Sequence, residues 1–364
     1  MRKKVLVVIG TRPNIIKITR FKSVASERGR LDVQIVHTGQ HYSANMADVF
    51  FDQFGIKPDH CLGVAAGSPT RQIADIMIGL EQVLTEQRPD LVVVVGDVNS
   101  TLAAAVTANK LGIPIGHLES GLRSFDRSMP EEHNRVVTDR LSDHYFVTEQ
   151  SGLDNLRAEG ARAGSVHFVG NTMIDTLVAY DSQIEASTAL EDFGLGEGGH
   201  VLMTLHRPAT VDSPERLAEV LDLVADITRD RKVVFPLHPR TAKNLVSFGL
   251  DSLARSIAGL VFTEPLDYFA FQKLVAKAGV VLTDSGGIQE ESTYRQVPCL
   301  TLRPNTERPI TVSVGSNELV PADMHVVRET IARIDAGQYK KGRIPPLWDG
   351  HATERVMETL EKVL

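Results

Sequence analysis

Short apolar runs alternate with amphipathic stretches of helix length along nearly the whole 364-residue chain. The runs are rich in Val, Ile and Leu, which is typical of parallel strands buried on both faces by helices. The expected strands are 4–9, 33–37, 91–95, 114–118, 144–147, 166–169, 201–205, 232–236, 260–262, 280–282 and 298–302. So many strands over this length predict two Rossmann-like parallel-sheet α/β domains rather than one.

The domain boundary is expected just after the strand that ends at residue 169, because a helical stretch and then a polar, glycine-rich segment follow it. This places the N-terminal domain at 1–170 and the second domain at 171–350. The last segment, 351–364, has the pattern of a helix, but periodicity alone does not indicate where it docks.

The composition excludes several classes of protein. No apolar run approaches the roughly 20 residues of a membrane span, and a net charge of -7 gives no sign of a nucleic-acid partner. The apolar run 5–9 is too short for the core of a signal peptide. Cys61 and Cys299 each lie beside apolar residues, so we expect two buried, reduced thiols in a cytoplasmic protein.

Polar and glycine-containing motifs follow one expected strand after another, always at the carboxyl end. They are Gly10–Pro13, Thr38–His41, Gly96-Asp97, His117–Ser120, His206-Arg207, His238–Arg240 and Asp284–Gly287. Open α/β sheets bind ligands at this end of their strands. Two sheets with these ends turned inward would line one central cleft.

The segment 283–291 is the most informative of these motifs. It follows an apolar strand and begins a helix, and Gly286 and Gly287 allow a close backbone approach to a ligand. Glu291, one turn into the helix, can hold sugar hydroxyls, so the segment predicts half of a nucleotide-sugar site. The alternative is an ordinary glycine-rich turn.

The motif after the first expected strand offers cations near a helix start. Arg12 and Lys17 would lie there, with Pro13 in the first turn, and could hold a diphosphate. The alternative is a solvated turn with surface cations. The chain contains neither Gly-x-Gly-x-x-Gly nor a P-loop, so no motif predicts a nicotinamide or ATP cofactor, and we expect none.

Several carboxylates are expected at one edge of the first sheet. Asp97 and Glu119 follow apolar strands, and Glu131 follows Pro130 at a predicted helix start. Acids that share a cleft can divide acid and base roles. The alternatives are that Asp97 caps the helix 99–111 and that Glu131 interacts only with the helix dipole.

Two histidine motifs predict different things about catalysis and metal binding. His206 ends a strand and could serve in catalysis, or it could only make a structural hydrogen bond. His37 and His41 have a metal-like spacing, but Thr38-Gly39 between them indicates a turn rather than a helix. No metal site is therefore expected.

Together these residues resemble the non-hydrolysing UDP-N-acetylglucosamine 2-epimerase family, along most of the chain. The resemblance is carried by Gly10–Lys17, Gly96-Asp97, His117–Arg123, Pro130–Glu132 with Asn134-Arg135, Gly170–Thr172, His206-Arg207, Thr283–Glu291 and Thr306–Pro309. It implies two Rossmann-like domains in the GT-B arrangement. It also implies that the helix 351–364 crosses back to the first domain, and that the protein is a homodimer.

The resemblance also implies roles for individual residues. The catalytic positions match Asp97, Glu119, Glu131 and His206. The substrate-binding positions match Arg12, Lys17, Ser285, Gly286 and Gly287 near the diphosphate, Glu291 at the ribose, Phe271 beside the uracil, and Arg135, His238 and Arg308. The implied reaction is the reversible C2 epimerisation of UDP-N-acetylglucosamine to UDP-N-acetylmannosamine by elimination and re-addition of UDP, for bacterial surface polysaccharides.

The sequence departs from the family pattern at a few positions. Asn14, Ala209 and Ile310 stand where Glu is commonest, which leaves the exact sugar open. Gln40 is kept, but Ser43 replaces a second glutamine that contributes to an activator site in some members. Other possible functions are epimerisation of UDP-diacetamido-glucuronate, a hydrolysing epimerase, a GT-B glycosyltransferase and a non-catalytic nucleotide-sugar sensor.

Overall fold

The protein forms two compact units in a computed structural model that describes residues 2–40, 44–65, 67–321 and 323–364. The first unit comprises 1–179 and 346–364, and the second comprises 180–345. Each contains a parallel sheet with helices, which confirms the predicted fold class. The sequence placed the boundary at 170, but α8 (Thr172–Ala179) contacts α1 and α19 and so belongs to the first unit.

The first unit contains a seven-stranded sheet in the order β3-β2-β1-β4-β5-β6-β7, and every strand pair is parallel. Its strands are β1 (Lys3–Ile9), β2 (Leu31–His37), β3 (His60–Cys61), β4 (Leu91–Val95), β5 (Ile115–Leu118), β6 (His144–Val147) and β7 (Val166–Phe168). The sequence predicted all of these strands except β3. Cys61 was expected to be buried but is exposed, because β3 is a two-residue edge strand.

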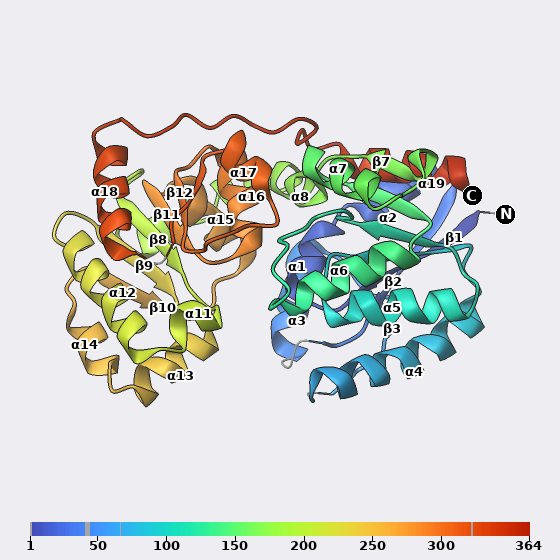
Figure 1. Cartoon of the computed structure of the whole chain (residues 1–364), viewed down its shortest axis with the longest axis horizontal. Helices are drawn as coiled ribbons and strands as arrows, with labels where there is room; N and C mark the ends of the chain where they lie inside the picture. Colours follow the sequence, from blue (N-terminus) through green and yellow to red (C-terminus); the bar gives the residue numbers. More distant parts are fainter. Residues whose placement is uncertain (1, 41–43, 66, 322) are drawn as a thin grey trace. The chain divides into compact units, whose positions relative to one another are not determined.

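Helices join the strands of this sheet. They are α1 (Arg12–Lys17), α2 (Phe21–Arg28), α3 (Ala44–Phe54), α4 (Pro69–Gln87), α5 (Asn99–Lys110), α6 (Pro130–Leu141), α7 (Gln150–Ala158), η1 (Ala163–Ser165), α8 and α19 (Ala352–Val363). Figure 1 shows α4, α5 and α6 side by side. Ile76, Leu80 and Leu84 of α4 pack with alanines of α5 against one face of the sheet, and this apolar layer fixes the sheet edge that carries the site.

The final helix, α19, is held on the first unit by buried contacts. The carboxylate of Asp175 in α8 accepts hydrogen bonds from the backbone N–H groups of Ala352 and Thr353, at 3.0 and 2.5 Å. It therefore satisfies two of the unpaired N–H groups at the start of α19. The Trp348 indole donates to the carbonyl of Thr148 at 3.1 Å.

The second unit contains a six-stranded parallel sheet in the order β10-β9-β8-β11-β12-β13. Its strands are β8 (His200–Thr204), β9 (Lys232–Pro236), β10 (Leu260–Thr263), β11 (Val280–Thr283), β12 (Cys299–Thr301) and β13 (Asn317–Leu319). Side chains along β8 alternate between two cores, with Val201 and Met203 in one and Leu202 in the other. Helices therefore cover both faces of this sheet.

The helices of the second unit follow the same alternation with strands. They are α9 (Asp181–Glu185), α10 (Ala189–Asp192), α11 (Pro208–Val211), α12 (Pro214–Ile227), α13 (Pro239–Ser247), α14 (Asp251–Ser256), α15 (Tyr268–Ala276), α16 (Gly286–Arg295), α17 (Pro309–Ser313) and α18 (Met324–Asp335). The sequence predicted one helical stretch over 172–184, but Tyr180 interrupts it between α8 and α9. Within the described residues, no helix is long and apolar enough to span a membrane.

Each sheet has one point at which its strand order reverses. In the first sheet the reversal lies between β1 and β4, and in the second it lies between β8 and β11. Loops diverge from such a point at the carboxyl ends of the strands and leave a crevice for ligands. The motifs Gly10–Pro13 and Gly96-Asp97 follow the first pair of strands, and His206-Arg207 and Asp284–Gly287 follow the second pair.

Candidate active site

Lys17 and Glu119 form a buried ion pair at the switch point of the first unit. The ammonium nitrogen of Lys17, at the end of α1, lies 2.5 Å from Oε2 of Glu119, just after β5. Gly96 lies beside the pair and has a φ of 68°, a left-handed conformation that favours glycine. The pair therefore brings together two residues that the sequence assigned to different roles.

Asp97 and Arg135 form a second pair in the first unit. The guanidinium of Arg135 in α6 pairs with the Asp97 carboxylate and also with Glu132, whose Oε2 lies 3.0 Å away. The Asn134 side chain donates to the backbone carbonyl of Asp97 at 2.8 Å. Asp97 was considered as a possible cap of the next helix, but Val98 occupies the N-cap position of α5.

Glu132 has a structural role that the sequence did not single out. Its carboxylate accepts the backbone N–H groups of Ser124 and Phe125, at 2.8 and 3.0 Å, and so holds the loop after β5 against α6. Glu131 lies in the first turn of the same helix and is only partly buried.

His117 links the ends of β4 and β5 to α6. Its Nε2 lies 2.8 Å from the carbonyl of Gly96, and its Nδ1 lies 2.6 Å from Asp139. Asp139 also accepts from the backbone N–H of Gly121 and pairs with Arg123 at 2.7 Å. Burial acts to raise the pKa of Asp139, but His117 and Arg123 outweigh it and the pKa is lowered.

Asn14 is a buried hydrogen-bonding centre at the turn between β1 and α1. Its Oδ1 accepts from the backbone N–H groups of Gly10 and Thr11 and from the Thr11 hydroxyl, at 3.2, 3.1 and 3.0 Å. Its Nδ2 donates to the carbonyl of Val95 at 3.2 Å. The neutral amide therefore fastens this turn to the end of β4.

His206 and Asp284 form the corresponding arrangement in the second unit. Nδ1 of His206 lies 2.8 Å from Oδ1 of Asp284, and the same carboxylate accepts the backbone N–H groups of His206 and Arg207. Burial acts to raise the pKa of Asp284, but the hydrogen bonds from His206 and Arg207 outweigh it and the pKa is lowered. An ionised Asp284 orients the His206 ring, whose side chain remains 38% exposed.

The start of α16 supplies backbone donors beside a buried ionic network. Ser285 is the N-cap residue, and Gly286 and Gly287 open the helix. Arg308 pairs with Glu290 at 2.7 Å and with Glu307 at 2.6 Å. A Cβ on Gly286 would lie only 2.7 Å from atoms of Arg308 and Glu307, so this turn has no space for a side chain.

The other predicted residues of the second unit lie in varied surroundings. The ring centroids of His238 and His206 are 5.5 Å apart, and Nδ1 of His238 accepts the backbone N–H of Arg240. Glu291 is buried in α16, and Phe271 of α15 packs against an apolar core of the second unit. In the first unit, His41 and Ser43 lie outside the described residues.

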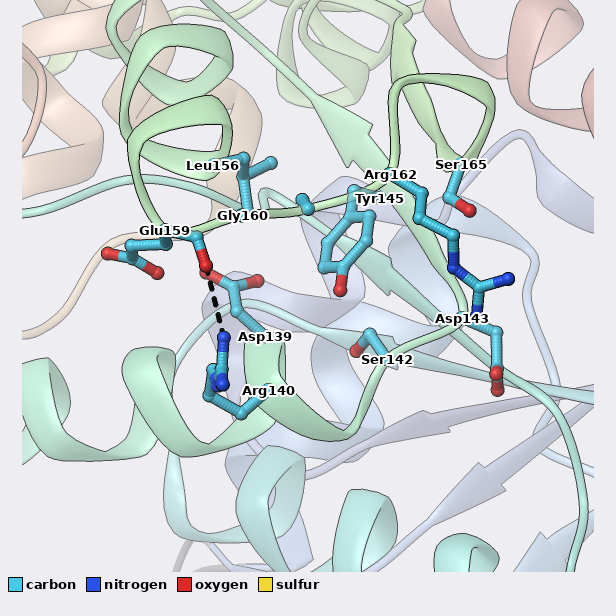
Figure 2. A pocket seen from close by; sticks show the side chains of 11 residues that line it. Asp139, Arg140, Ser142, Asp143, Tyr145, Leu156, Glu159, Gly160, Arg162 and Ser165 are labelled. Carbon is cyan, nitrogen blue, oxygen red and sulfur yellow. Dashed lines mark hydrogen bonds between the residues drawn. The ribbon is translucent and has the colours of Figure 1, made fainter.

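A pocket lies at the amino ends of β6 and β7, and Asp139, the partner of His117, is among the residues that line it (Figure 2). Asp139, Arg140 and Ser142 from the end of α6 line it, together with Asp143 and Tyr145 around the start of β6. Because these residues are at the amino end of β6, the pocket is separate from the switch point. Across the described parts of the chain, no cluster of three potential metal ligands is present.

The sequence placed most of these side chains correctly at strand ends or helix starts but did not indicate their partners. Asp284 pairs with His206, and Glu132 pairs with Arg135. His117 bonds to the carbonyl of Gly96. All three residues, Asp284, Glu132 and His117, lie within motifs that the sequence contains, which was the available signal. Their partners could not be inferred, because most of these contacts join segments that are far apart in the sequence.

Two parallel-sheet units with motifs at their switch points are typical of nucleotide-sugar enzymes of GT-B-like architecture, and the similarity to known proteins agrees with this class. The UDP-N-acetylglucosamine 2-epimerase family profile matches residues 24–361. A UDP-N-acetylglucosamine 2-epimerase of Methanocaldococcus jannaschii is 41% identical over 87% of this chain and 88% of its own. The crystal structure of that organism's enzyme with UDP-GlcNAc and UDP has a TM-score of 0.89 at 38% identity, over 99% of both chains.

Another relative carries a different sugar in its name. The UDP-2,3-diacetamido-2,3-dideoxy-D-glucuronate 2-epimerase of Pseudomonas aeruginosa is 38% identical over 99% of this chain and 100% of its own. These similarities extend over nearly the whole chain. The chain belongs to the UDP-N-acetylglucosamine 2-epimerase family.

Proposed function

We propose that this protein interconverts UDP-N-acetylglucosamine and UDP-N-acetylmannosamine without net hydrolysis. The observation that carries the proposal is the pairing of carboxylates with cations at the switch point of the first unit, Glu119 with Lys17 and Asp97 with Arg135. The M. jannaschii enzyme was crystallised with UDP-GlcNAc and UDP, and its similarity supports this substrate.

The chemistry requires acids and bases on both faces of the sugar. The C2 hydrogen is poorly acidic, but it becomes removable when the C1–O bond breaks, its electron pair leaves with UDP, and positive charge builds at C1. Loss of the C2 proton then gives 2-acetamidoglucal. Protonation of the opposite face of C2 and return of UDP to C1 complete the inversion, so at least two separately placed groups are needed.

The candidate site residues of each unit are assigned a role in this reaction. Asp97, Glu119 and Glu131 of the first unit are proposed to move the C2 proton, with His206 as a further acid or base whose ring is held by Asp284. Ser285, Gly286 and Gly287 are proposed to bind the departing diphosphate through backbone N–H groups. Arg12 and Lys17 are proposed as further contacts of the diphosphate, with Glu291 at the ribose and Phe271 beside the uracil. Arg135, His238 and Arg308 are proposed to bind other parts of the substrate.

The purified protein should therefore act on UDP-N-acetylglucosamine alone. Incubation in heavy water, followed by NMR, should give UDP-N-acetylmannosamine with deuterium at C2 and no need for added NAD. Free N-acetylmannosamine as the main product would instead indicate hydrolysis. Protium retained at C2, or a requirement for NAD, would exclude elimination and re-addition.

The P. aeruginosa relative favours a second candidate, epimerisation of UDP-2,3-diacetamido-glucuronate, because it aligns with the full length of this chain. Parallel assays with both UDP sugars at equal concentration decide between them through the ratio of kcat/KM values. A GT-B glycosyltransferase would show turnover only when an acceptor is added.

We also propose a cytoplasmic homodimer that needs no cofactor and supplies a precursor of surface polysaccharides. The family resemblance supports this setting. Light scattering of the purified protein gives its mass directly, and the monomer is 39.9 kDa. A mass near that value would exclude the dimer.

A further inference from the structure

Arg12 is partly buried, and it differs from the buried Lys and Arg residues of the described chain in having no carboxylate partner. The buried Lys and Arg residues of the described chain each pair with a carboxylate: Lys17, Arg123, Arg135, Lys273, Arg303 and Arg308. Arg12 forms no ion pair with any acid in the described residues. Burial alone lowers its pKa, since the guanidinium loses water without gaining an anion.

The contact that Arg12 does make is with an aromatic ring. Its guanidinium carbon lies 5.1 Å from the ring centroid of Phe50 in α3, within the range of a cation–π interaction. Phe50 is itself only 6% exposed, and Phe54, one turn later, supports it with a centroid distance of 6.2 Å. The ring face attracts the cation but does not neutralise it, so the guanidinium keeps its full charge for an incoming anion.

We propose that Phe50 is a positioning residue that holds the Arg12 guanidinium ready for the diphosphate of the nucleotide sugar. The inference rests on the proposed function, because it takes the anion to be that diphosphate. An arginine side chain has many rotamers, and restricting them before the ligand arrives reduces the entropy that binding must remove. A planar guanidinium lying over a ring is held in orientation as well as in place.

The alternative is that Phe50 only fills the core. Phe51 provides the matched control, because it lies in the same helix and is also 6% exposed. Its ring meets His37 edge-on at 5.2 Å. Replacing Phe50 or Phe51 by Leu therefore removes the same atoms from equally buried positions of α3, and only the first change removes the ring that contacts Arg12.

The test is calorimetric titration of the full-length protein with UDP and, separately, with uridine. Phe50→Leu should weaken UDP binding by about fivefold to tenfold, the effect of losing one desolvated cation–π contact, and should leave uridine binding unchanged. Phe51→Leu should leave both affinities unchanged. Phe50→Tyr keeps a ring face and should restore UDP affinity to the wild-type value.

A double-mutant cycle separates positioning from packing. Arg12→Ala should weaken UDP binding, and adding Phe50→Leu to Arg12→Ala should cause no further loss, because the ring then has no guanidinium to hold. Melting temperatures of all variants identify any general damage to α3. If Phe50→Leu does not fold, Phe50→Met, whose unbranched side chain adapts to irregular gaps, replaces it in the same cycle.

The outcomes are distinct. Equal loss of UDP affinity in the Phe50 and Phe51 variants, equal loss for uridine and UDP, or additive effects of Arg12→Ala and Phe50→Leu would each overturn the positioning role. Unchanged UDP affinity in Arg12→Ala would remove Arg12 from the nucleotide site. Absence of UDP binding by the unaltered protein would overturn the proposed function itself, and this inference with it.

Discussion

Glu119 adopts a backbone conformation that is unusual for its residue type. Its φ is 69°, in the left-handed region that favours glycine. Such a conformation costs on the order of 1–3 kcal/mol and persists where neighbouring contacts impose it. Here the carbonyl of Phe146 accepts from the N–H groups of both Glu119 and Ser120, at 3.1 and 3.2 Å. The turn thereby points the carboxylate toward Lys17.

Neutral replacement of the acids should separate chemistry from folding. Asp97→Asn, Glu119→Gln and Glu131→Gln should each lower turnover by roughly a hundredfold or more, the usual contribution of a general acid or base. Turnover is measured by NMR and folding by circular dichroism. Glu81→Gln, at an exposed position of α4, is the control and should keep full activity. Near-normal turnover in all three variants would remove the acids from the mechanism.

His117 should carry protons on both ring nitrogens. The carbonyl of Gly96 can only accept, and the ionised Asp139 can only accept, so Nε2 and Nδ1 must both donate. Nitrogen-15 NMR of the His ring should show two protonated nitrogens in the native protein. Asp139→Asn should return His117 to one ring proton. A single protonated nitrogen in the unaltered protein would contradict this arrangement.

The residue types of the site were predictable, whereas their partners were not. Asp97, Glu119 and His206 each follow an apolar strand, and that local pattern is visible in the sequence. The pairing of Asp97 with Arg135 depends on α6 returning across the sheet, and it joins residues 38 positions apart. Such pairs depend on tertiary packing, which strand-end patterns do not encode.

At the scale of elements, two histidines at the edge of the first sheet make the folding stability depend on pH. His144 of β6 and His167 of β7 have ring centroids 5.7 Å apart. Burial lowers the pKa of both rings, and His144 lowers that of His167 further. The folded state therefore binds fewer protons than the unfolded state, whose histidines titrate near pH 6.5.

The melting temperature should be highest above about pH 6.5 and should fall as the pH decreases below it, since protonation then favours the unfolded chain. The His144→Phe/His167→Phe double variant should show a smaller decrease between pH 7 and pH 5. His325→Ala, at an exposed site of α18, should retain the wild-type pH dependence. The same slope in the double variant would show that other groups govern this transition.

Strands with an apolar pattern were predictable, and two short edge strands were not. All eleven expected strands correspond to strands of the structure, because most are runs of buried aliphatic residues and the others, such as β6 and β7, combine aliphatic with aromatic residues. The two that were missed, β3 and β13, have two and three residues and lie at sheet edges. Neighbouring strands induce these short segments, and they carry little periodicity of their own.

At the scale of the whole molecule, the first unit depends on the end of the chain. Val356, Met357 and Leu360 of α19 are fully buried. A variant ending at residue 345 should lose about 5 kcal/mol or more of stability in the first unit, because burying each such side chain contributes about 1.5–3 kcal/mol.

Hydrogen exchange checks this prediction unit by unit. Amide protection should decrease in β1 to β7 of the truncated variant and should persist in β8 to β13. The fragment 180–345, produced alone, is the matched control and should keep its protection. Unchanged protection in β1 to β7 would show that the first unit does not need α19.

The caps on α19 have a consequence for how the protein is made. A ribosome synthesises the 179 residues of the first segment before the second unit, and only afterwards the residues that complete the first unit. The second unit is one continuous segment, so it can fold as soon as it leaves the ribosome. Until Ala352 and Thr353 arrive, Asp175 lacks the N–H groups that it binds in the native state. Until then, the apolar surface that α19 covers in the native first unit stays exposed, and chaperones should bind it at that stage.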